Sequence, residues 1–172
     1  MAVDRLARVE GDVRRLRQRI FTASREGDLR KVRSLQKLLL RSRANALVAV
    51  RRVAEVNAGR MTAGIDGMAA LGPKPKADLA DWAQRRTAGW DPWPVKRAWV
   101  PKTGGRQRPL GIPVMRDRVL QAVVLGALEP EWEARFEPRS YGFVRHEARG
   151  IEGGERPSPS CCRSSMTKLG AA

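Results

Sequence analysis

The stretch "LARVEGDVRRLRQRIFTASREGDLRKVRSLQKLLL" (residues 6–40) decides the fold. Its first apolar side chains recur every three or four positions, as on one face of an α-helix, at Leu6, Val9, Val13, Leu16 and Ile20. Ser24 and Asp28 are capping residues on either side of Gly27, and a second helical pattern then runs from Leu29 to Val53. The pattern predicts two helices that pack as a hairpin.

Charge is concentrated in the same region. The 172-residue chain has 34 basic and 18 acidic side chains, a formal charge of +16. Residues 1–60 contain 16 basic and 6 acidic side chains, a charge of +10 in about a third of the chain. This excess indicates a polyanionic partner, because few carboxylates are available to neutralise it. The alternative is a solvated helical face with no partner.

The rest of the chain predicts an α+β fold that is mainly helical. A glycine-rich loop at 61–72 precedes a short helix through Leu79 and Trp82. Alternating residues at 94–100, the Gly104-Gly105 pair and a returning strand predict a β-hairpin. A helix follows from residue 115, and we expect Pro130 to end it. From Val144 the periodicity is lost, which predicts a disordered tail.

Several classes of protein are disfavoured. The longest apolar run, residues 119–128, is too short to cross a bilayer, and no signal-peptide pattern opens the chain. Cys161 and Cys162 are adjacent and without a second ligand pair, and His146 has no visible partner. We therefore expect a cytoplasmic protein of bacterial type, without a membrane, a zinc site or a disulfide framework.

The hairpin motif "PKTGGRQRPLGIP" (residues 101–113) leaves two interpretations open. Lys102 and Arg108 could hold one anion together across the glycine turn, with backbone N–H groups close to phosphate oxygens. The plainer alternative is a solvated basic turn. Asp66, between two glycines, is similarly either a metal ligand or a cap of its own backbone. The five tryptophans could stack on bases but fit core packing as well, so we assign them no site.

Three further segments join the arginine-rich helices in an unbroken order: "TAGIDG", "PKTGGRQRPLGIPVMRDRVLQ" and "LEPEWEARFEPRSYGF". Together, over residues 10–143, they resemble the amino-terminal part of group II intron-encoded proteins, the reverse transcriptase and maturase family. The resemblance implies that the first helices form an extension that binds intron RNA. Its implied RNA-binding residues are Arg14, Arg15, Arg17, Arg19, Arg25, Arg30, Lys31, Arg33, Lys37, Arg41 and Arg43.

The resemblance also implies a partial fingers region of a right-hand polymerase. Residues 97–113 look like the first polymerase motif, in which Lys102 and Arg108 would contact the incoming nucleoside triphosphate. The loop before this motif and the start of the second motif would line the template path, through Gly64, Ile65, Asp66, Gly67, Arg139 and Tyr141.

The sequence also departs from the family pattern in two places. After Phe143 the family pattern stops, which suggests a frameshift or truncation, and the palm aspartates that hold two Mg²⁺ ions have no match. We therefore expect an RNA-binding extension at 1–60, partial fingers at 61–143 and a non-family tail at 144–172, with no catalytic or metal-binding residue and no cofactor of its own. Alternatives are a fingers subunit completed in trans, which would bind template and nucleotide, or a non-functional gene product. An uncovered apolar face on the helix at 115–129 would favour oligomerisation.

Overall fold

The computed structural model describes residues 2–85 and 89–136, with side chains from Leu6 onward. Its helices are α1 (Ala2–Arg25), α2 (Leu29–Arg41), α3 (Arg43–Arg51), α4 (Pro73–Arg85) and α5 (Met115–Glu133), and its strands are β1 (Lys96–Pro101) and β2 (Gln107–Ile112). A π-helical turn (Arg52–Val56) and a 3₁₀ turn (Ala58–Met61) continue α3. The mainly helical α+β class is confirmed. The predicted tail lies outside the described residues.

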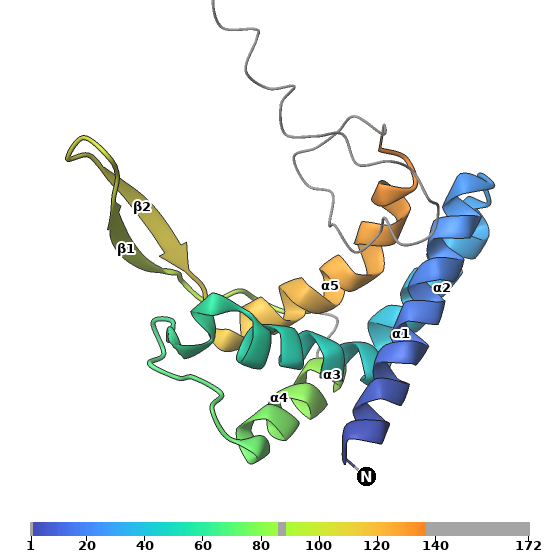
Figure 1. Cartoon of the computed structure of the whole chain (residues 1–172), viewed down its shortest axis with the longest axis horizontal. Helices are drawn as coiled ribbons and strands as arrows, with labels where there is room; N and C mark the ends of the chain where they lie inside the picture. The colour runs from blue at the N-terminus through green and yellow to red at the C-terminus, as the bar shows by residue number, and fades with distance from the viewer. Residues whose placement is uncertain (1, 86–88, 137–172) are drawn as a thin grey trace, which may run out of the picture. The chain divides into compact units, whose positions relative to one another are not determined.

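Helices α1 and α2 form the predicted hairpin (Figure 1). Gly27 turns the chain with a φ of +75°, a conformation that glycine adopts without strain. The Asp28 carboxylate then accepts a hydrogen bond of 3.0 Å from the backbone N–H of Lys31 and caps α2. The two helices bury Ile20, Val32 and Leu39 between them and α5.

The prediction of one continuous helix from Leu29 to Val53 is wrong. Ser42 has an extended backbone (φ −74°, ψ 126°), so α2 ends and α3 begins in a new direction. The new direction lets α3 pack on α4 and α5, where the Asn45 side-chain amide donates to the Val123 carbonyl at 3.1 Å. Gly126 makes room for this crossing, because a Cβ there would lie 2.9 Å from Asn45 Oδ1. Apolar periodicity runs through the break because both helices bury a face.

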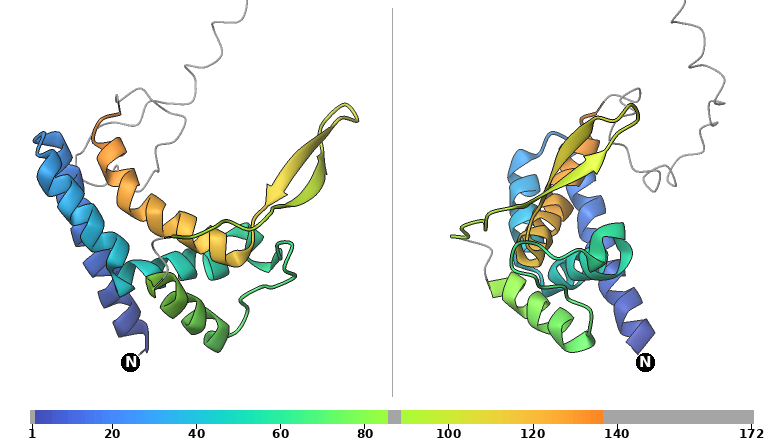
Figure 2. Two further views of the ribbon diagram at one scale, coloured as in Figure 1. Left: turned by 180° about the vertical axis from the view of Figure 1, so that it is seen from behind. Right: turned by 90° about the vertical axis from the view of Figure 1, so that its left-hand side faces the viewer.

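Helix α5 is the central element, and it packs on α1, α2, α3 and α4 (Figures 1 and 2). It does not end at Pro130 as predicted but continues to Glu133. Proline costs this helix the hydrogen bond to the carbonyl four residues earlier. Contacts beyond Pro130 offset that loss: Ser24 Oγ donates to the Glu131 carbonyl at 3.1 Å, and Gln36 Nε2 donates to the Glu131 carboxylate at 2.7 Å.

The β-hairpin is confirmed and projects away from the helices (Figure 1). Gly104 and Gly105 have φ values of 87° and 72°, a conformation that glycine adopts in a turn without strain. The Lys102 N–H donates to the Arg106 carbonyl at 2.7 Å and closes the turn. Each strand of this two-stranded sheet has a free edge, so Pro109 is tolerated in β2.

Within residues 2–85 and 89–136, no helix combines the length and the apolar character needed to span a membrane. These residues fall within a single unit, Met1–Phe136. The boundaries at residues 60 and 143, set from the sequence, stay predictions.

Candidate nucleic-acid interface

Helix α2 presents a row of cations to solvent. It contains five basic residues and no acidic one. Its buried residues Val32, Leu35 and Leu39 set the inner face, and the opposite face carries Arg30, Arg33, Lys37 and Arg41 at helical spacing, all exposed. None of these four forms an ion pair with a carboxylate in the described part of the chain. The row is about 16 Å long, a length over which one strand of a duplex carries about five phosphates.

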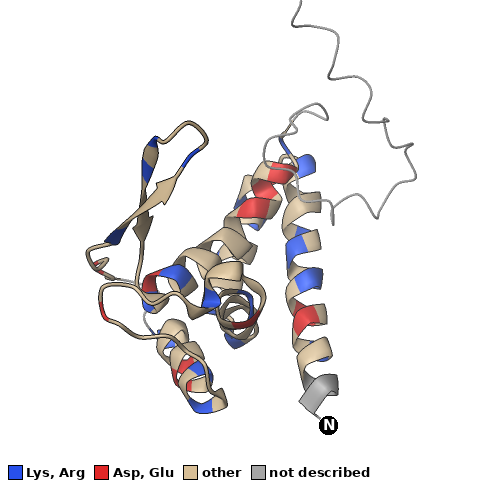
Figure 3. Cartoon of the chain, turned by 60° about the vertical axis from the view of Figure 1, so that its left-hand side comes forward, with Lys and Arg blue, Asp and Glu red and all other residues tan. Residues whose placement is uncertain are grey.

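Basic and acidic positions both lie along helix α1 (Figure 3). Fewer of its cations are unpaired than its sequence suggests. Arg14, Arg19 and Arg25 are exposed and pair with no carboxylate among the described residues. Arg15, by contrast, pairs with Asp12 on the same helix. Arg17 points toward α5, where it pairs with Glu129 at 2.8 Å and is only 26% exposed.

Two further predicted RNA-binding residues also have carboxylate partners. Arg43 pairs with Asp81 of α4 at 2.9 Å, and Lys31 lies 3.8 Å from Glu26. The structure therefore leaves Arg14, Arg19 and Arg25 of α1 and the four cations of α2 exposed and without a carboxylate partner among the described residues, and we call these seven cations the outer basic face. It assigns Arg17 to the contact between helices.

The carboxylates at the end of α5 are directed inward rather than toward the outer basic face. Glu129 contacts Arg17, and Glu131 contacts Gln36. Burial raises the pKa of Glu133 above its ordinary value, the nearby Glu129 raises it further, and Arg17 opposes both effects. The acidic end of α5 thus holds the helical hairpin without neutralising its solvent face.

Lys102 and Arg108 lie on the same face of the β-hairpin. Arg108 is opposite Val100, and Lys102 is opposite Arg106 across the turn. Directly opposed residues share a face of the sheet, and so do residues two positions apart. Both side chains are exposed. The register therefore meets the geometric condition for joint contact with one anion, and nucleotide binding itself stays a prediction.

The loop with the predicted template residues lies against the base of this hairpin. Gly64 is buried, and a Cβ built there would lie 2.7 Å from Val114 Cα. Its carbonyl accepts from the Gly67 N–H at 3.3 Å, and Ile65 between them is 55% exposed. The Asp66 carboxylate accepts from the Met68 N–H at 3.2 Å, which is the plainer of the two sequence interpretations. Arg139 and Tyr141 lie outside the described residues.

Arg118, which the sequence did not single out, fixes this loop. Its guanidinium donates to the Pro113 carbonyl at 2.8 Å, to the Gly59 carbonyl at 3.0 Å and to the Thr62 carbonyl at 2.7 Å. Desolvation by burial lowers its pKa from the ordinary value, and the nearby Asp66 carboxylate opposes the shift. No sequence signal could reveal this role, because two of the three acceptors are backbone carbonyls 56 and 59 positions away.

A second organising residue is Asp117, which is 4% exposed. Its carboxylate accepts from Trp90 Nε1 at 2.6 Å and from the Trp93 N–H at 3.1 Å. Trp90 in turn packs edge-to-face on Trp82, with ring centroids 4.9 Å apart. These two tryptophans serve packing, whereas Trp93, Trp99 and Trp132 are 49%, 57% and 50% exposed.

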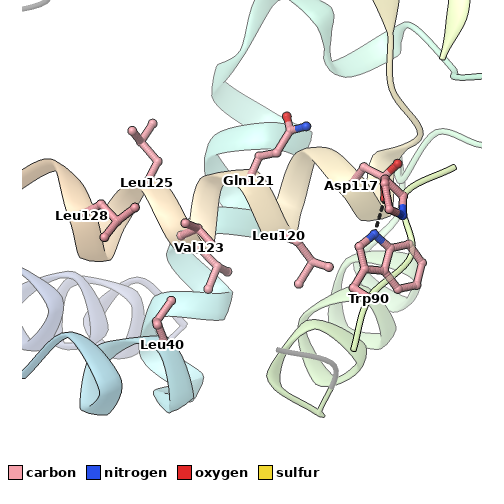
Figure 4. Close-up of a pocket in the computed structure, with 10 residues that line it drawn as sticks. Leu40, Trp90, Asp117, Leu120, Gln121, Val123, Leu125 and Leu128 are labelled. Atoms are coloured by element: carbon pink, nitrogen blue, oxygen red, sulfur yellow. Dashed lines mark hydrogen bonds between the residues drawn. The ribbon is translucent and has the colours of Figure 1, made fainter. Parts of the chain in front are cut away.

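The expected uncovered face of α5 is present. Leu120, Leu125 and Leu128 line a groove of about 580 Å³ together with Leu40 and Trp90 (Figure 4). Val124, Leu125 and Leu128 are at least 40% exposed. Among the described residues, no three His, Cys, Asp or Glu side chains are grouped as a metal ion would require. The groove is therefore an apolar surface.

Comparison with known proteins agrees with this arrangement. Residues 5–82 match the N-terminal domain of reverse transcriptase. The chain is 35% identical over 127 residues to protein YkfC of Escherichia coli K12. The aligned region covers 69% of the chain and 33% of YkfC. It is 27% and 26% identical to maturase-like protein 1 of Euglena gracilis and Euglena longa, over 75% of the chain and 28% of each relative. The chain thus spans about a third or less of these relatives' length. These matches support the similarity of the chain to the amino-terminal part of a group II intron reverse transcriptase and maturase.

Proposed function

We propose that the outer basic face of α1 and α2 binds the structured RNA of a group II intron. The observation that carries this proposal is the row of four exposed cations on α2, a helix that contains no acidic residue. A polyanion that neutralises such a row releases condensed counterions, which is the main source of salt-sensitive affinity. Two of the relatives are named maturase-like, which supports intron RNA as the partner.

Polymerisation is not assigned to this chain. The chemistry needs palm carboxylates that hold two Mg²⁺ ions, and the resemblance gives no match for them within these 172 residues. A second candidate function is a fingers segment that another polypeptide completes in trans. The uncovered apolar groove along α5 favours it, because such a surface is typical of a face that packs on further protein. Lys102 and Arg108 would then contact the nucleotide.

The test is filter binding of the full chain to the parent intron RNA and to an unrelated RNA of equal length, across a salt series. The variant Arg30→Gln/Arg33→Gln/Lys37→Gln removes three charges from the outer basic face. The matched control, Arg60→Gln/Lys74→Gln/Arg85→Gln, removes three exposed charges elsewhere. Each lost phosphate contact lowers the slope of log affinity against log salt by about 0.7–0.9.

We expect the α2 variant to lower that slope by about two to three and the control by less than one. The pair Arg14→Gln/Arg19→Gln should add to the loss, because it leaves the ion pair of Arg17 and Glu129 intact. If the α2 variant and its control lowered the slope equally, the result would contradict the proposal that RNA binds specifically to the outer basic face. Absence of binding to either RNA would favour the non-functional alternative.

A further inference from the structure

The two faces of the β-hairpin differ in character. One carries Lys102 and Arg108, as described above. The other, which we call the Trp99 face, carries Arg97, Trp99, Pro101, Gln107, Pro109 and Gly111. Trp99 is 57% exposed, although a tryptophan gains more than most residues from burial.

The surroundings of Trp99 leave its indole ring open. Pro109 lies directly opposite on β2, and the diagonal neighbour Gly111 has no side chain. Val95 occupies the space beside Gly111, since a Cβ at that glycine would lie 3.2 Å from Val95 Cγ2. No long side chain from β2 therefore separates the ring from solvent, apart from Gln107 toward the turn.

The positive charge of the hairpin indicates an anionic partner. Residues 95–112 contain five basic side chains and no acidic one. Arg97 lies on the Trp99 face itself, two positions from the tryptophan. An exposed aromatic ring among cations, without carboxylates, is the combination that single-stranded nucleic acids require: the ring stacks on a base and the cations contact the phosphates. A purely apolar protein partner would not need five charges.

We propose that Trp99 stacks on an unpaired base of a single-stranded RNA or DNA, with Arg97 contacting the adjoining phosphate. The site is separate from the outer basic face and from the face of Lys102 and Arg108. It therefore does not depend on intron RNA binding by α1 and α2.

The experiment measures binding of the full chain to labelled oligouridine and oligothymidine of about twelve nucleotides, a length within the usual range of single-strand sites, by fluorescence anisotropy. A blunt duplex of the same length and heparin serve as ligands without accessible bases. The variants are Trp99→Ala, Trp99→Phe and, as a matched control, Trp132→Ala, which removes a tryptophan of similar exposure (50%) in the last turn of α5.

We expect Trp99→Ala to weaken single-strand binding about tenfold, the usual effect of removing one stacked aromatic. Trp99→Phe should retain most of the affinity, and Trp132→Ala should bind as the unchanged protein does. Heparin and duplex binding should be the same for all variants. A loss confined to the RNA or to the DNA strand also supports stacking and identifies the strand.

Three results would overturn the proposal: unchanged single-strand binding by Trp99→Ala, an equal loss toward heparin, or an equal loss in Trp132→Ala. The first would point to a protein that covers Trp99. If the α2 variant bound intron RNA as tightly as the unchanged protein, the test of Trp99 would still stand, because the two experiments use different residues and different ligands.

Discussion

Replacing Gly64 by alanine should loosen the loop that lies against the base of the hairpin. The added Cβ would lie 2.7 Å from Val114 Cα, 2.9 Å from Val114 N and 3.0 Å from the Pro113 carbonyl oxygen. All three are backbone atoms at the junction of β2 and α5, so no flexible side chain can move aside. The loop must shift, and the Arg118 hydrogen bonds to Gly59 and Thr62 are the contacts that a shift would break.

The magnitude follows from these contacts. Overpacking of this kind costs about 1–3 kcal/mol, and a lost hydrogen bond from a charged donor costs about 1.5–3 kcal/mol. Since the loop can relax partly, we expect the free energy of unfolding to fall by about 2–4 kcal/mol. With a denaturant slope of about 2 kcal/mol per molar, the urea midpoint should fall by about 1–2 M. Circular dichroism at the helix band measures this.

Two other glycines provide the controls. Gly67 has a φ of +68° and nothing within 4 Å of its built Cβ, so Gly67→Ala tests backbone strain alone and should cost about 1 kcal/mol. Gly11 is within α1 and meets only the flexible end of Arg15 at 3.6 Å. Gly11→Ala should therefore stabilise the protein by about 0.5–1 kcal/mol. A Gly64→Ala midpoint equal to that of Gly67→Ala would refute the backbone contact.

Two further predictions concern the partly buried carboxylate of Glu133 and the buried carboxylate of Asp117. Burial raises the pKa of Glu133 in the folded state, because it disfavours the ionised carboxylate. The contribution of the protonated side chain to folding stability is therefore complete below the unfolded pKa of 4.5 and is lost as pH rises through the folded pKa. Glu133→Gln should therefore raise the unfolding temperature at pH 7 and leave it nearly unchanged at pH 4, and equal gains at both would show that ionisation is not the cause. Asp117→Ala removes the acceptor of Trp90 Nε1 and the Trp93 N–H, and should cost about 2–4 kcal/mol in urea unfolding with a shift in tryptophan emission. Asp117→Asn, which keeps one acceptor oxygen, should lose less, and full stability in the alanine variant would contradict the role of this carboxylate.

Local signals predicted most of the elements correctly. The spacing of Leu6 to Ile20, the Gly27-Asp28 turn and the Gly104-Gly105 pair each specify a structure within a few residues, because helix faces, caps and hairpin turns depend on neighbouring positions. The errors lie where distant contacts override a local preference. Ser42 gives no strong helix-breaking signal, yet the chain turns there so that α3 reaches α5. Pro130 is a strong helix-breaking signal, yet α5 continues past it because Ser24 of α1 and Gln36 of α2 form hydrogen bonds to its last turn.

The candidate site divides in the same way. The sequence by itself determined the sign and the density of charge on the first two helices and the position of Lys102 and Arg108 on either side of one hairpin turn, since composition and turn signals are local properties. Only the tertiary structure decided which cations remain free: Arg17 is next to α5 and pairs with Glu129, whereas Arg19, two positions along the helix, faces solvent. It also decided that Arg118 and Gly64 join two loops far apart in the chain. The physical reason is that the Arg17 ion pair, the close approach of Gly64 to the Val114 backbone and the Arg118 hydrogen bonds each depend on distances between segments. The order of residues along the chain does not fix those distances.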